Sequence, residues 1–439
     1  MSHQQTPQTI TIGLAGLGTV GSSVFRNLEA NHLLLRERTG FEFRVAKVVV
    51  RDRTRARAVS LPDSRLFTDW QVLVDDPEID VIVELMGGID EPYKLVRAAL
   101  EAKKMVVTGN KALLAEHGAE LFALAREVGV PIFFEAAVAG GIPVIKAVKE
   151  SLVGNHISSI HGIINGTSNY ILSRMSEAGL SFHSALAEAQ EKGYAEADPT
   201  LDVNGWDAAH KAVILASLSY GYWVNTADIR VEGIEKVAAQ DITYAAKLGY
   251  GIKLVAVIKA DDAGTIECRV QPSLVPKEHI LASVRGVHNA IVVRGDMVGQ
   301  VMFFGPGAGG DATASSVISD IVDAAHALAG EPRNTGFVTH ELYGTTKPAT
   351  ETVSEFYLRI PVNDQPGVIA GVAGVLADHA IGIAATASLP PSEMPEGKFN
   401  EVIFLTHEAP LGILTQAVEK IAGLPYVTGA PLSLRVERL

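Results

Sequence analysis

The strongest constraint on the fold is a glycine-rich turn, GLGTVG at residues 16–21, placed between a predicted strand and a predicted helix. Residues 9–15 form a short apolar run typical of a buried strand, and residues 22–35 have helical periodicity. Strand-like and helix-like segments then alternate to about residue 143. This alternation predicts an α/β fold with a parallel sheet and helices on both faces. Further strands are predicted at residues 42–50, 80–85, 105–108 and 132–135, and helices at 91–102 and 112–128.

The turn has the pattern of a Rossmann dinucleotide-binding site. Gly16 permits the tight turn, Gly18 lets the backbone approach a pyrophosphate, and Gly21 allows the helix to pack closely on the strand. The start of the helix supplies N–H donors and a favourable dipole for the phosphates. The predicted cofactor-binding residues of the turn are Gly16, Leu17, Gly18, Thr19, Val20 and Gly21.

The end of the second predicted strand bears on which dinucleotide binds. An NAD site places an acidic residue there for the ribose 2′-hydroxyl, whereas arginine suits the 2′-phosphate of NADP. Here Arg51 is the first polar residue and Arg53 is near, so the sequence favours NADP. Asp52 between them leaves NAD open.

Three domains are predicted along the 439 residues. Residues 1–150 form the nucleotide-binding domain, and residues 151–309 form a mixed α/β substrate-binding and dimerisation domain. A glycine cluster at 305–310 opens a predicted helix over 313–328. Residues 346–439 have the element order βαββαβ, which is the ferredoxin-like plan.

Composition excludes several classes of function. The net charge of −13 argues against a nucleic-acid binder. No run of 18 apolar residues could span a bilayer, so no membrane partner is expected. Cys268 is the only cysteine, which excludes an intrachain disulfide and a cysteine-based zinc site and favours the cytoplasm. Histidines show no HExxH-like spacing, so no transition-metal site is expected.

The segment GYAEADPTLDVNGWDAAHK, residues 193–211, is the most informative for function. It holds four carboxylates and leads into an apolar, helix-compatible run over 206–219. Asp207 and Lys211 are four residues apart near the start of that helix and therefore share one face. Burying such charges is costly unless they are paired or meet a ligand. The segment therefore predicts a polar site inside the protein.

Together, this segment and the nucleotide turn resemble homoserine dehydrogenase over about residues 9–345. Segments 107–115 (VTGNKALLA), 135–143 (EAAVAGGIP) and 164–172 (INGTSNYIL) resemble the family too, with Gly109 replacing the family's common alanine. The matching signature positions are Ala189, Gly193, Tyr194, Ala195, Glu196, Asp198, Pro199, Asp202, Gly205, Asp207 and Lys211.

The resemblance implies NAD(P)-dependent interconversion of L-homoserine and L-aspartate 4-semialdehyde. It makes Lys211 the proton-transfer residue, a role that requires a second influence to lower the pKa of a lysine beside a carboxylate. Lys111 is the second active-site lysine, which binds the cofactor, polarises the carbonyl, or both. Asp207 and Glu196 contact homoserine, and Asp202 supports the network.

Four further assignments follow from the resemblance. Thr167 and Tyr194 are expected near the substrate, although hydroxyls satisfied in local turns are an equal alternative. Gly309 is expected to approach the cofactor, with residues 310–345 returning to the nucleotide-binding domain. A sodium ion is implied in the loop formed by Glu135, Val138, Gly140 and Ile142.

The C-terminal unit resembles an ACT domain, an amino-acid-sensing module, through the motif DQPGV at residues 364–368. Threonine is the effector implied by the resemblance, and an ACT fold kept for oligomerisation alone is the alternative. A homodimer or homotetramer is expected.

Two alternative functions stay open. One is another amino-acid dehydrogenase on the same nucleotide fold. Aspartate-semialdehyde dehydrogenase is disfavoured because it needs a catalytic cysteine, and Cys268 lies in an alternating, strand-like run. The other is a sensor that binds nucleotide and amino acid without catalysis, against which the intact Asp207 and Lys211 pair argues.

Overall fold

The structure, a computed structural model, describes residues 7–331, 336–363, 365–387 and 400–439. The chain divides into two compact units, and each takes three separate stretches of sequence. The first unit contains Met1–Ile157, Val213–Thr226 and Arg294–Tyr343, and the second contains Ser158–Ala212, Ala227–Val293 and Gly344–Leu439. Among the helices of these described residues, none combines the length and apolarity needed to cross a membrane.

A six-stranded sheet forms the centre of the first unit. Its order is β3-β2-β1-β4-β5-β6, and every neighbouring pair is parallel, as the sequence predicted. The isoleucine, leucine and alanine side chains of β1 are fully buried, as expected for a strand inside a parallel sheet that is covered on both faces. The strands are β1 (Gln8–Ala15), β2 (Phe41–Val49), β3 (Leu66–Phe67), β4 (Val81–Glu84), β5 (Met105–Thr108) and β6 (Ile132–Phe133).

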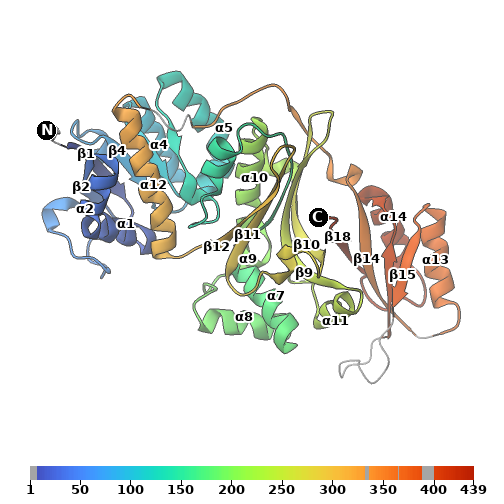
Figure 1. Ribbon diagram of the computed structural model, residues 1–439. Coiled ribbons are helices and arrows are strands. Elements are labelled where there is room, and N and C mark those ends of the chain that lie inside the picture. The colour runs from blue at the N-terminus through green and yellow to red at the C-terminus, as the bar shows by residue number, and fades with distance from the viewer. Residues whose placement is uncertain (1–6, 332–335, 364, 388–399) are drawn as a thin grey trace. The chain divides into compact units, whose positions relative to one another are not determined.

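Helices flank this sheet, and one of them comes from late in the chain. Helix α12 (Gly310–Leu328) packs against α1 (Thr19–Ala30), beside which it lies in Figure 1. The single helix predicted over residues 22–35 is wrong. Helix α1 ends at Ala30, and α2 (His32–Thr39) begins after a single intervening residue, Asn31. The other elements of the unit are α3 (Gln71–Val74), α4 (Asp90–Glu101), α5 (Lys111–Val128), α6 (Val144–Lys146) and β12 (Gly299–Pro306).

The second unit is built on a mostly antiparallel sheet with the order β11-β7-β9-β10-β18-β14-β16-β15. The long pair β9 and β10 forms its centre, and helix α7 packs on β9. The strands are β7 (Ile157–Ile163), β9 (Tyr250–Ala260), β10 (Thr265–Pro276), β11 (His288–Gly295), β14 (Val353–Val362), β15 (Ile383–Ala387), β16 (Asn400–Thr406) and β18 (Leu432–Val436). The helices are α7 (Gly166–Ala178), α8 (Phe182–Glu191), α9 (Thr200–Val203), α10 (Trp206–Tyr220, which continues into the first unit), α11 (Ala239–Lys247), α13 (Val368–Asp378) and α14 (Leu411–Ala422). Three two-residue strands flank the sheet: β8 (Arg230–Val231), β13 (Thr345–Thr346) and β17 (Ala409–Pro410).

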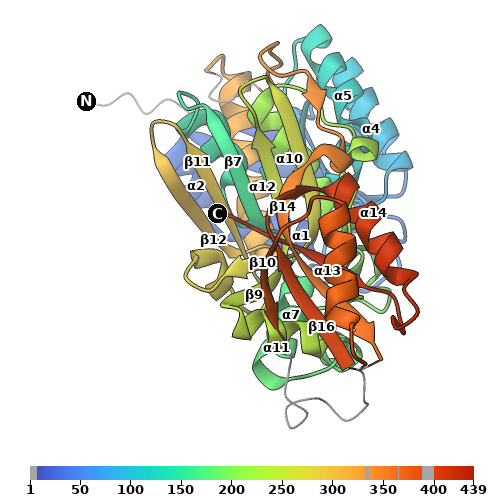
Figure 2. The same cartoon turned by 90° about the vertical axis from the view of Figure 1, so that its right-hand side faces the viewer.

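The last part of the chain has the predicted βαββαβ order, with the strands arranged β18-β14-β16-β15. Helices α13 and α14 lie side by side in Figure 2 and share one apolar core with β14. Asp364 of the DQPGV motif lies outside the described residues.

One strand joins this C-terminal part to the middle of the chain. β18 pairs in parallel with β10, through Ser273 opposite Arg435, and antiparallel with β14. Strands that the sequence assigned to two domains therefore share one continuous sheet.

Candidate active site

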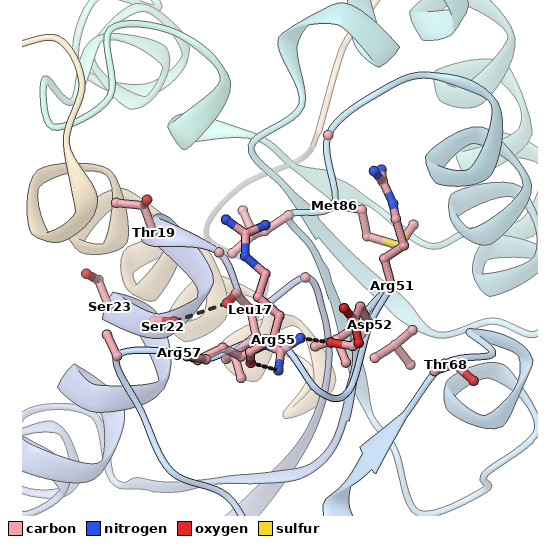
Figure 3. A pocket seen from close by; sticks show the side chains of 18 of the residues that line it. Leu17, Thr19, Ser22, Ser23, Arg51, Asp52, Arg55, Arg57, Thr68 and Met86 are labelled. Carbon is pink, nitrogen blue, oxygen red and sulfur yellow. Dashed lines mark hydrogen bonds between the residues drawn. The ribbon is translucent and has the colours of Figure 1, made fainter. Parts of the chain in front are cut away.

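The glycine turn opens onto a cavity of about 810 Å³ in the first unit. This volume is in the range of sites for cofactors and other small molecules. Figure 3 shows Thr19, Ser22 and Ser23 of α1 on one side of the cavity and Arg51 and Asp52, which follow β2, on the other.

The three glycines of the turn differ in what a side chain would contact at each position. A Cβ atom on Gly16, whose φ is +101°, would lie 2.3 Å from the carbonyl oxygen of Leu85. A Cβ atom on Gly21 would lie 2.1 Å from the carbonyl oxygen of Gly16. A Cβ atom on Gly18 would meet no atom of the protein within 4 Å. Gly18 is the N-cap of α1 and provides no side-chain cap for the first N–H groups of that helix.

A second helix begins beside this turn. Gly309, with a φ of +117°, is the N-cap of α12. A Cβ atom on the next residue, Gly310, would lie 2.7 Å from Oγ of Ser23, which lines the cavity. The returning helix predicted for this part of the chain therefore reaches the cofactor side of the sheet.

Four arginines line the cavity. Arg51, Arg55 and Arg57 come from the loop after β2, and Arg26 comes from α1. Arg53, which the sequence also suggested, instead donates to the carbonyl of Asp63 at 3.1 Å. Arg57 donates to the backbone carbonyls of Asp52 and Arg55.

Asp52 is held by its own loop. One carboxylate oxygen accepts from the backbone N–H of Thr54 at 2.8 Å and from its hydroxyl at 2.7 Å. These bonds lower the pKa of Asp52. The acidic residue that left NAD open is thus engaged in a turn.

Lys111 occupies the first position of α5, at the carboxyl end of β5. Asn110 caps this helix by accepting from the backbone N–H of Leu113 at 3.1 Å. The Lys111 side chain is half-buried and is not among the residues that line the cavity.

The predicted acidic site lies in the second unit, and Asn165 organises it. The Nδ2 atom of Asn165 donates to Asp202 at 2.7 Å and to Asp207 at 2.8 Å. Its Oδ1 atom caps α7 by accepting from the N–H of Ser168. One buried amide therefore joins two carboxylates that are distant from it in sequence.

Lys211 completes this cluster. Its ammonium donates to Oδ2 of Asp207 and to the carbonyl of Ile164, both at 2.7 Å. Lys211 is only 8% exposed, and the sequence-predicted sharing of one helix face with Asp207 is confirmed. Burial raises the pKa of Asp202, although the hydrogen bond from Asn165 opposes that change.

The loop before α9 is anchored by backbone contacts. Thr167 donates to the carbonyl of Tyr194 at 2.8 Å, and the Tyr194 ring packs edge-on against Tyr170. The Tyr194 and Glu196 side chains are exposed, while the Glu196 carbonyl accepts from Gln190 at 3.1 Å. Asp198 accepts from Thr200, the local structural role expected of it.

In the loop predicted to bind a cation, the carboxylate of Glu135 accepts hydrogen bonds from the backbone. The two oxygens of Glu135 accept from the backbone N–H groups of Ile145 and Lys146 at 2.9 and 2.8 Å. Burial raises the pKa of Glu135 to about 7. The carbonyl of Gly140 accepts from Ser316 at 2.6 Å, and that of Ile142 accepts from the N–H of Val144 at 2.8 Å. Across the described ranges, no three His, Cys, Asp or Glu side chains form a metal-binding group.

Asn165 and the two arginines Arg55 and Arg57 were not predicted as site residues from the sequence. Asn165 precedes a helix as Asn-Gly-Thr-Ser, a recognisable N-cap pattern, but its distant partners carry no local signal. Arg55 and Arg57 lie within the arginine-rich run RDRTRAR, so their composition was a usable signal.

Comparison with known proteins decides the family. Residues 143–322 match the family described as homoserine dehydrogenase, and residues 16–135 match the homoserine dehydrogenase NAD-binding domain. The homoserine dehydrogenase of Synechocystis sp. is 42% identical over 439 residues, covering 98% of this chain and 99% of the relative. This chain belongs to the homoserine dehydrogenase family. It is therefore an oxidoreductase with an NAD-binding domain, and the resemblance found in its sequence is confirmed.

Solved homoserine dehydrogenases have the same fold. The enzyme of Thiobacillus denitrificans superimposes with a TM-score of 0.90 at 39% identity, covering 98% of both chains. A hyperthermophilic archaeal homoserine dehydrogenase in complex with NADPH matches with a TM-score of 0.60 at 30% identity. That match covers 72% of this chain and 98% of the archaeal one, so this homoserine dehydrogenase carries additional sequence.

Proposed function

We propose that the chain catalyses the NAD(P)-dependent interconversion of L-homoserine and L-aspartate 4-semialdehyde. The observation that carries the proposal is the buried cluster of Asn165, Asp202, Asp207 and Lys211. An ammonium and two carboxylates withdrawn from water suit a small substrate that itself has an ammonium, a carboxylate and a reacting oxygen. Relatives named homoserine dehydrogenase at 41–42% identity support the assignment.

In this mechanism the nicotinamide cofactor, when bound, supplies the hydride chemistry. The glycine turn and the start of α1 hold its phosphates through backbone N–H groups. Lys211 moves the proton at the reacting oxygen, and Asp207 orients the lysine through their 2.7 Å contact. Glu196 and Asp207 bind the substrate ammonium, and Asp202 supports Asp207 through Asn165. Lys111 binds the cofactor or polarises the carbonyl. Thr167 holds the backbone of Tyr194, which keeps the Glu196 loop in place.

NADP is the proposed cofactor of preference. Arg51, Arg55 and Arg57 line the cavity and offer a cationic surface to a 2′-phosphate. The Asp52 carboxylate is already bonded to Thr54, which weakens it as an acceptor for a ribose 2′-hydroxyl. The archaeal relative solved with NADPH agrees with this preference.

A sodium ion in the loop of Glu135, Val138, Gly140 and Ile142 fits only as a carbonyl-bound ion. The Glu135 carboxylate caps a helix start, so backbone carbonyls would hold a weakly charged cation. The carbonyls of Gly140 and Ile142 each accept one hydrogen bond already and would use their second lone pair. Ala139 and Gly140 have φ values of +56° and +51°, an unusual local turn that reorients successive carbonyls.

The C-terminal βαββαβ part is proposed to be an ACT domain that binds an amino-acid effector, threonine by the family resemblance.

A homodimer or homotetramer is proposed as well. Met297 and Phe304, near and within the edge strand β12, are 77% and 55% exposed. Large apolar side chains left exposed in this way suit an interface between subunits. The single, buried Cys268 agrees with a cytoplasmic location.

A spectrophotometric assay tests the central proposal. Purified protein should reduce NADP⁺ in the presence of L-homoserine, and Lys211→Ala should abolish the reaction. Homoserine-dependent reduction that survives in Lys211→Ala would refute the mechanism. A wild-type protein that binds NADPH but never turns over homoserine would favour the non-catalytic sensor, and turnover of a different amino-acid alcohol would favour another dehydrogenase.

A further inference from the structure

A fully buried carboxylate at the cofactor edge of the sheet has no part in the mechanism above. Glu84 is the last residue of β4, is 0% exposed, and lies opposite Thr108, the last residue of β5. A carboxylate withdrawn completely from water is costly unless hydrogen bonds compensate it. Its partners therefore indicate what it is for.

The partners of Glu84 belong to two different loops. Its Oε1 atom accepts from the backbone N–H of Met86 at 2.8 Å, and its Oε2 atom accepts from the Thr108 hydroxyl at 2.6 Å. The Thr108 oxygen in turn accepts from the N–H of Asn110 at 3.0 Å. Asn110 donates through Nδ2 to the carbonyl of Gly88 at 2.8 Å. These four bonds close a ring between the loop after β4 and the loop after β5.

Both loops belong to the site. Leu85, Met86 and Gly87 line the nucleotide cavity beside Gly16 and Gly18. The other loop ends at Asn110, which caps α5 directly before Lys111. Gly87 and Gly88 have φ values of +74° and +78°, a conformation that glycine adopts readily and most other residues avoid.

We propose that Glu84 is a positioning residue that fixes the cofactor-lining loop 85–88 and the start of α5 with Lys111 relative to each other. The inference rests on the proposed function, because Lys111 has its role only in that reaction. Burial raises the pKa of Glu84, and the hydrogen bonds from Thr108 and Met86 oppose that rise. The ring transmits a displacement of one loop to the other, which couples cofactor seating to the lysine.

Glutamine cannot replace the carboxylate in this ring. If its amide nitrogen faces Met86, two donors meet. If the nitrogen faces Thr108, it donates to the Thr108 oxygen, so that hydrogen bond is reversed and the hydroxyl proton loses its buried acceptor. Glu84→Gln therefore weakens one side of the ring in either orientation. Thr108→Val removes the bond to Glu84 and the bond from Asn110, and it leaves the bond between Glu84 and Met86 intact.

The test compares Glu84→Gln, Thr108→Val and Val81→Ala, the last a fully buried residue at the other end of β4. Amide hydrogen exchange, NADPH binding by fluorescence titration, and kcat and KM with homoserine and NADP⁺ are measured for each. Glu84→Gln should speed exchange in both 85–88 and 109–113, weaken NADPH binding about tenfold and lower kcat. Thr108→Val should speed exchange mainly in 109–113 and lower kcat with a smaller change in binding. Val81→Ala should lower Tm without these effects.

Two outcomes overturn the proposal. One is exchange and NADPH binding in Glu84→Gln that match those of Val81→Ala. The other is faster exchange in only one of the two loops of Glu84→Gln. Failure of wild type to oxidise homoserine would instead refute the proposed function, and the binding and exchange measurements would still report on Glu84. If Glu84→Gln does not fold, a Thr108→Val variant with unaltered exchange in 109–113 and unaltered kcat overturns the inference.

Discussion

The Lys211 ammonium lies 2.7 Å from Oδ2 of Asp207, and the two side chains retain only 10% and 14% exposure. A buried ion pair adds little to folding stability because desolvation offsets the attraction between the charges. Here the same carboxylate oxygen also accepts from Asn165, which is itself bonded to Asp202. So much buried polarity at one place is better explained by chemistry than by stability.

Lys211→Arg should separate the charge of this residue from its proton transfer. Arginine can keep the ion pair with Asp207, but it does not release a proton in proteins. We expect kcat to fall by ~10²–10⁴, with a smaller change in KM for homoserine, measured by steady-state kinetics. Lys192→Arg, at an exposed lysine paired with Glu188, is the matched control and should retain wild-type kcat. Full activity in Lys211→Arg would rule out the lysine as the proton carrier.

Asn165→Asp should damage the site while leaving helix α7 capped. The new carboxylate can still accept from the N–H of Ser168, but it cannot donate to Asp202 and Asp207 and adds a like charge beside them. We expect kcat/KM for homoserine to fall about 10–100-fold, in line with the loss of hydrogen bonds to charged groups. Asn165→Ala, which loses the cap as well, should also lower Tm. A Tm loss in Asn165→Asp equal to that of Asn165→Ala, with kcat/KM unaltered, would show that the amide serves only the fold.

The glycine turn and the pairing of Asp207 with Lys211 could be predicted because both are local patterns. A strand, a turn and a helix start follow each other within residues 8–30, and four-residue spacing places two side chains on one helix face. Asn165 could not be assigned its role in this way. Its partners are 37 and 42 residues away, and only the packing of α7 near α9 and α10 brings them together.

The sheet of the second unit also contains a long-range pairing that local sequence patterns do not predict. The order βαββαβ near the C-terminus follows from local periodicity, and it is observed. The parallel pairing of β18 with β10 joins residues about 160 positions apart. No local pattern specifies that pairing, because an edge strand can accept any neighbour of suitable register. The break between α1 and α2 was also missed, since residues 22–35 are helix-compatible on both sides of Asn31.

Gly18→Ala and Gly21→Ala should fail in different ways. A methyl group on Gly21 would collide with the Gly16 carbonyl at 2.1 Å, so this variant should lose roughly 2–3 kcal/mol of stability. A methyl group on Gly18 meets no protein atom, so Tm should be retained while NADPH binding weakens. Thermal melts and NADPH titration distinguish the two variants. Tight NADPH binding by Gly18→Ala would place the pyrophosphate elsewhere.

Arg55→Ala should weaken NADP binding selectively. Arg55 lines the cavity, whereas Arg57 also holds the loop through the carbonyls of Asp52 and Arg55. We therefore expect Arg55→Ala to raise KM for NADP⁺ several-fold with KM for NAD⁺ unaffected, and Arg57→Ala to raise both. Arg53→Ala, on the arginine bonded to Asp63, is the control. Equal effects of Arg55→Ala on the two cofactors would remove this arginine from 2′-phosphate recognition.

The C-terminal strand should make the protein sensitive to acid. Glu437, one residue after β18, accepts two bonds from Arg269 at 2.7 and 2.9 Å. Burial alone would raise the pKa of Glu437, but Arg269 outweighs it and lowers the pKa to about 2. Nearby, burial lowers the pKa of His161 to about 3. Both groups bind protons more readily when the protein is unfolded, so each stabilises the fold at higher pH.

The two groups act in different pH windows. The contribution of His161 is complete above its unfolded pKa of 6.5 and is lost as pH falls from there toward 3. That of Glu437 is complete above 4.5 and is lost as pH falls toward 2. The raised pKa of Glu135, about 7, acts in the opposite direction and stabilises the fold as pH falls from 7 toward 4.5, so wild type and His161→Leu are compared by urea unfolding from pH 8 to pH 4. Between pH 6.5 and 4.5 the free energy of unfolding of wild type should fall relative to that of His161→Leu. Glu437→Gln should instead lower stability at neutral pH by about 3 kcal/mol, because Arg269 loses its fully buried bidentate partner and keeps only its bond to Glu267. Identical pH profiles in wild type and His161→Leu would contradict the assignment of the upper window to this histidine.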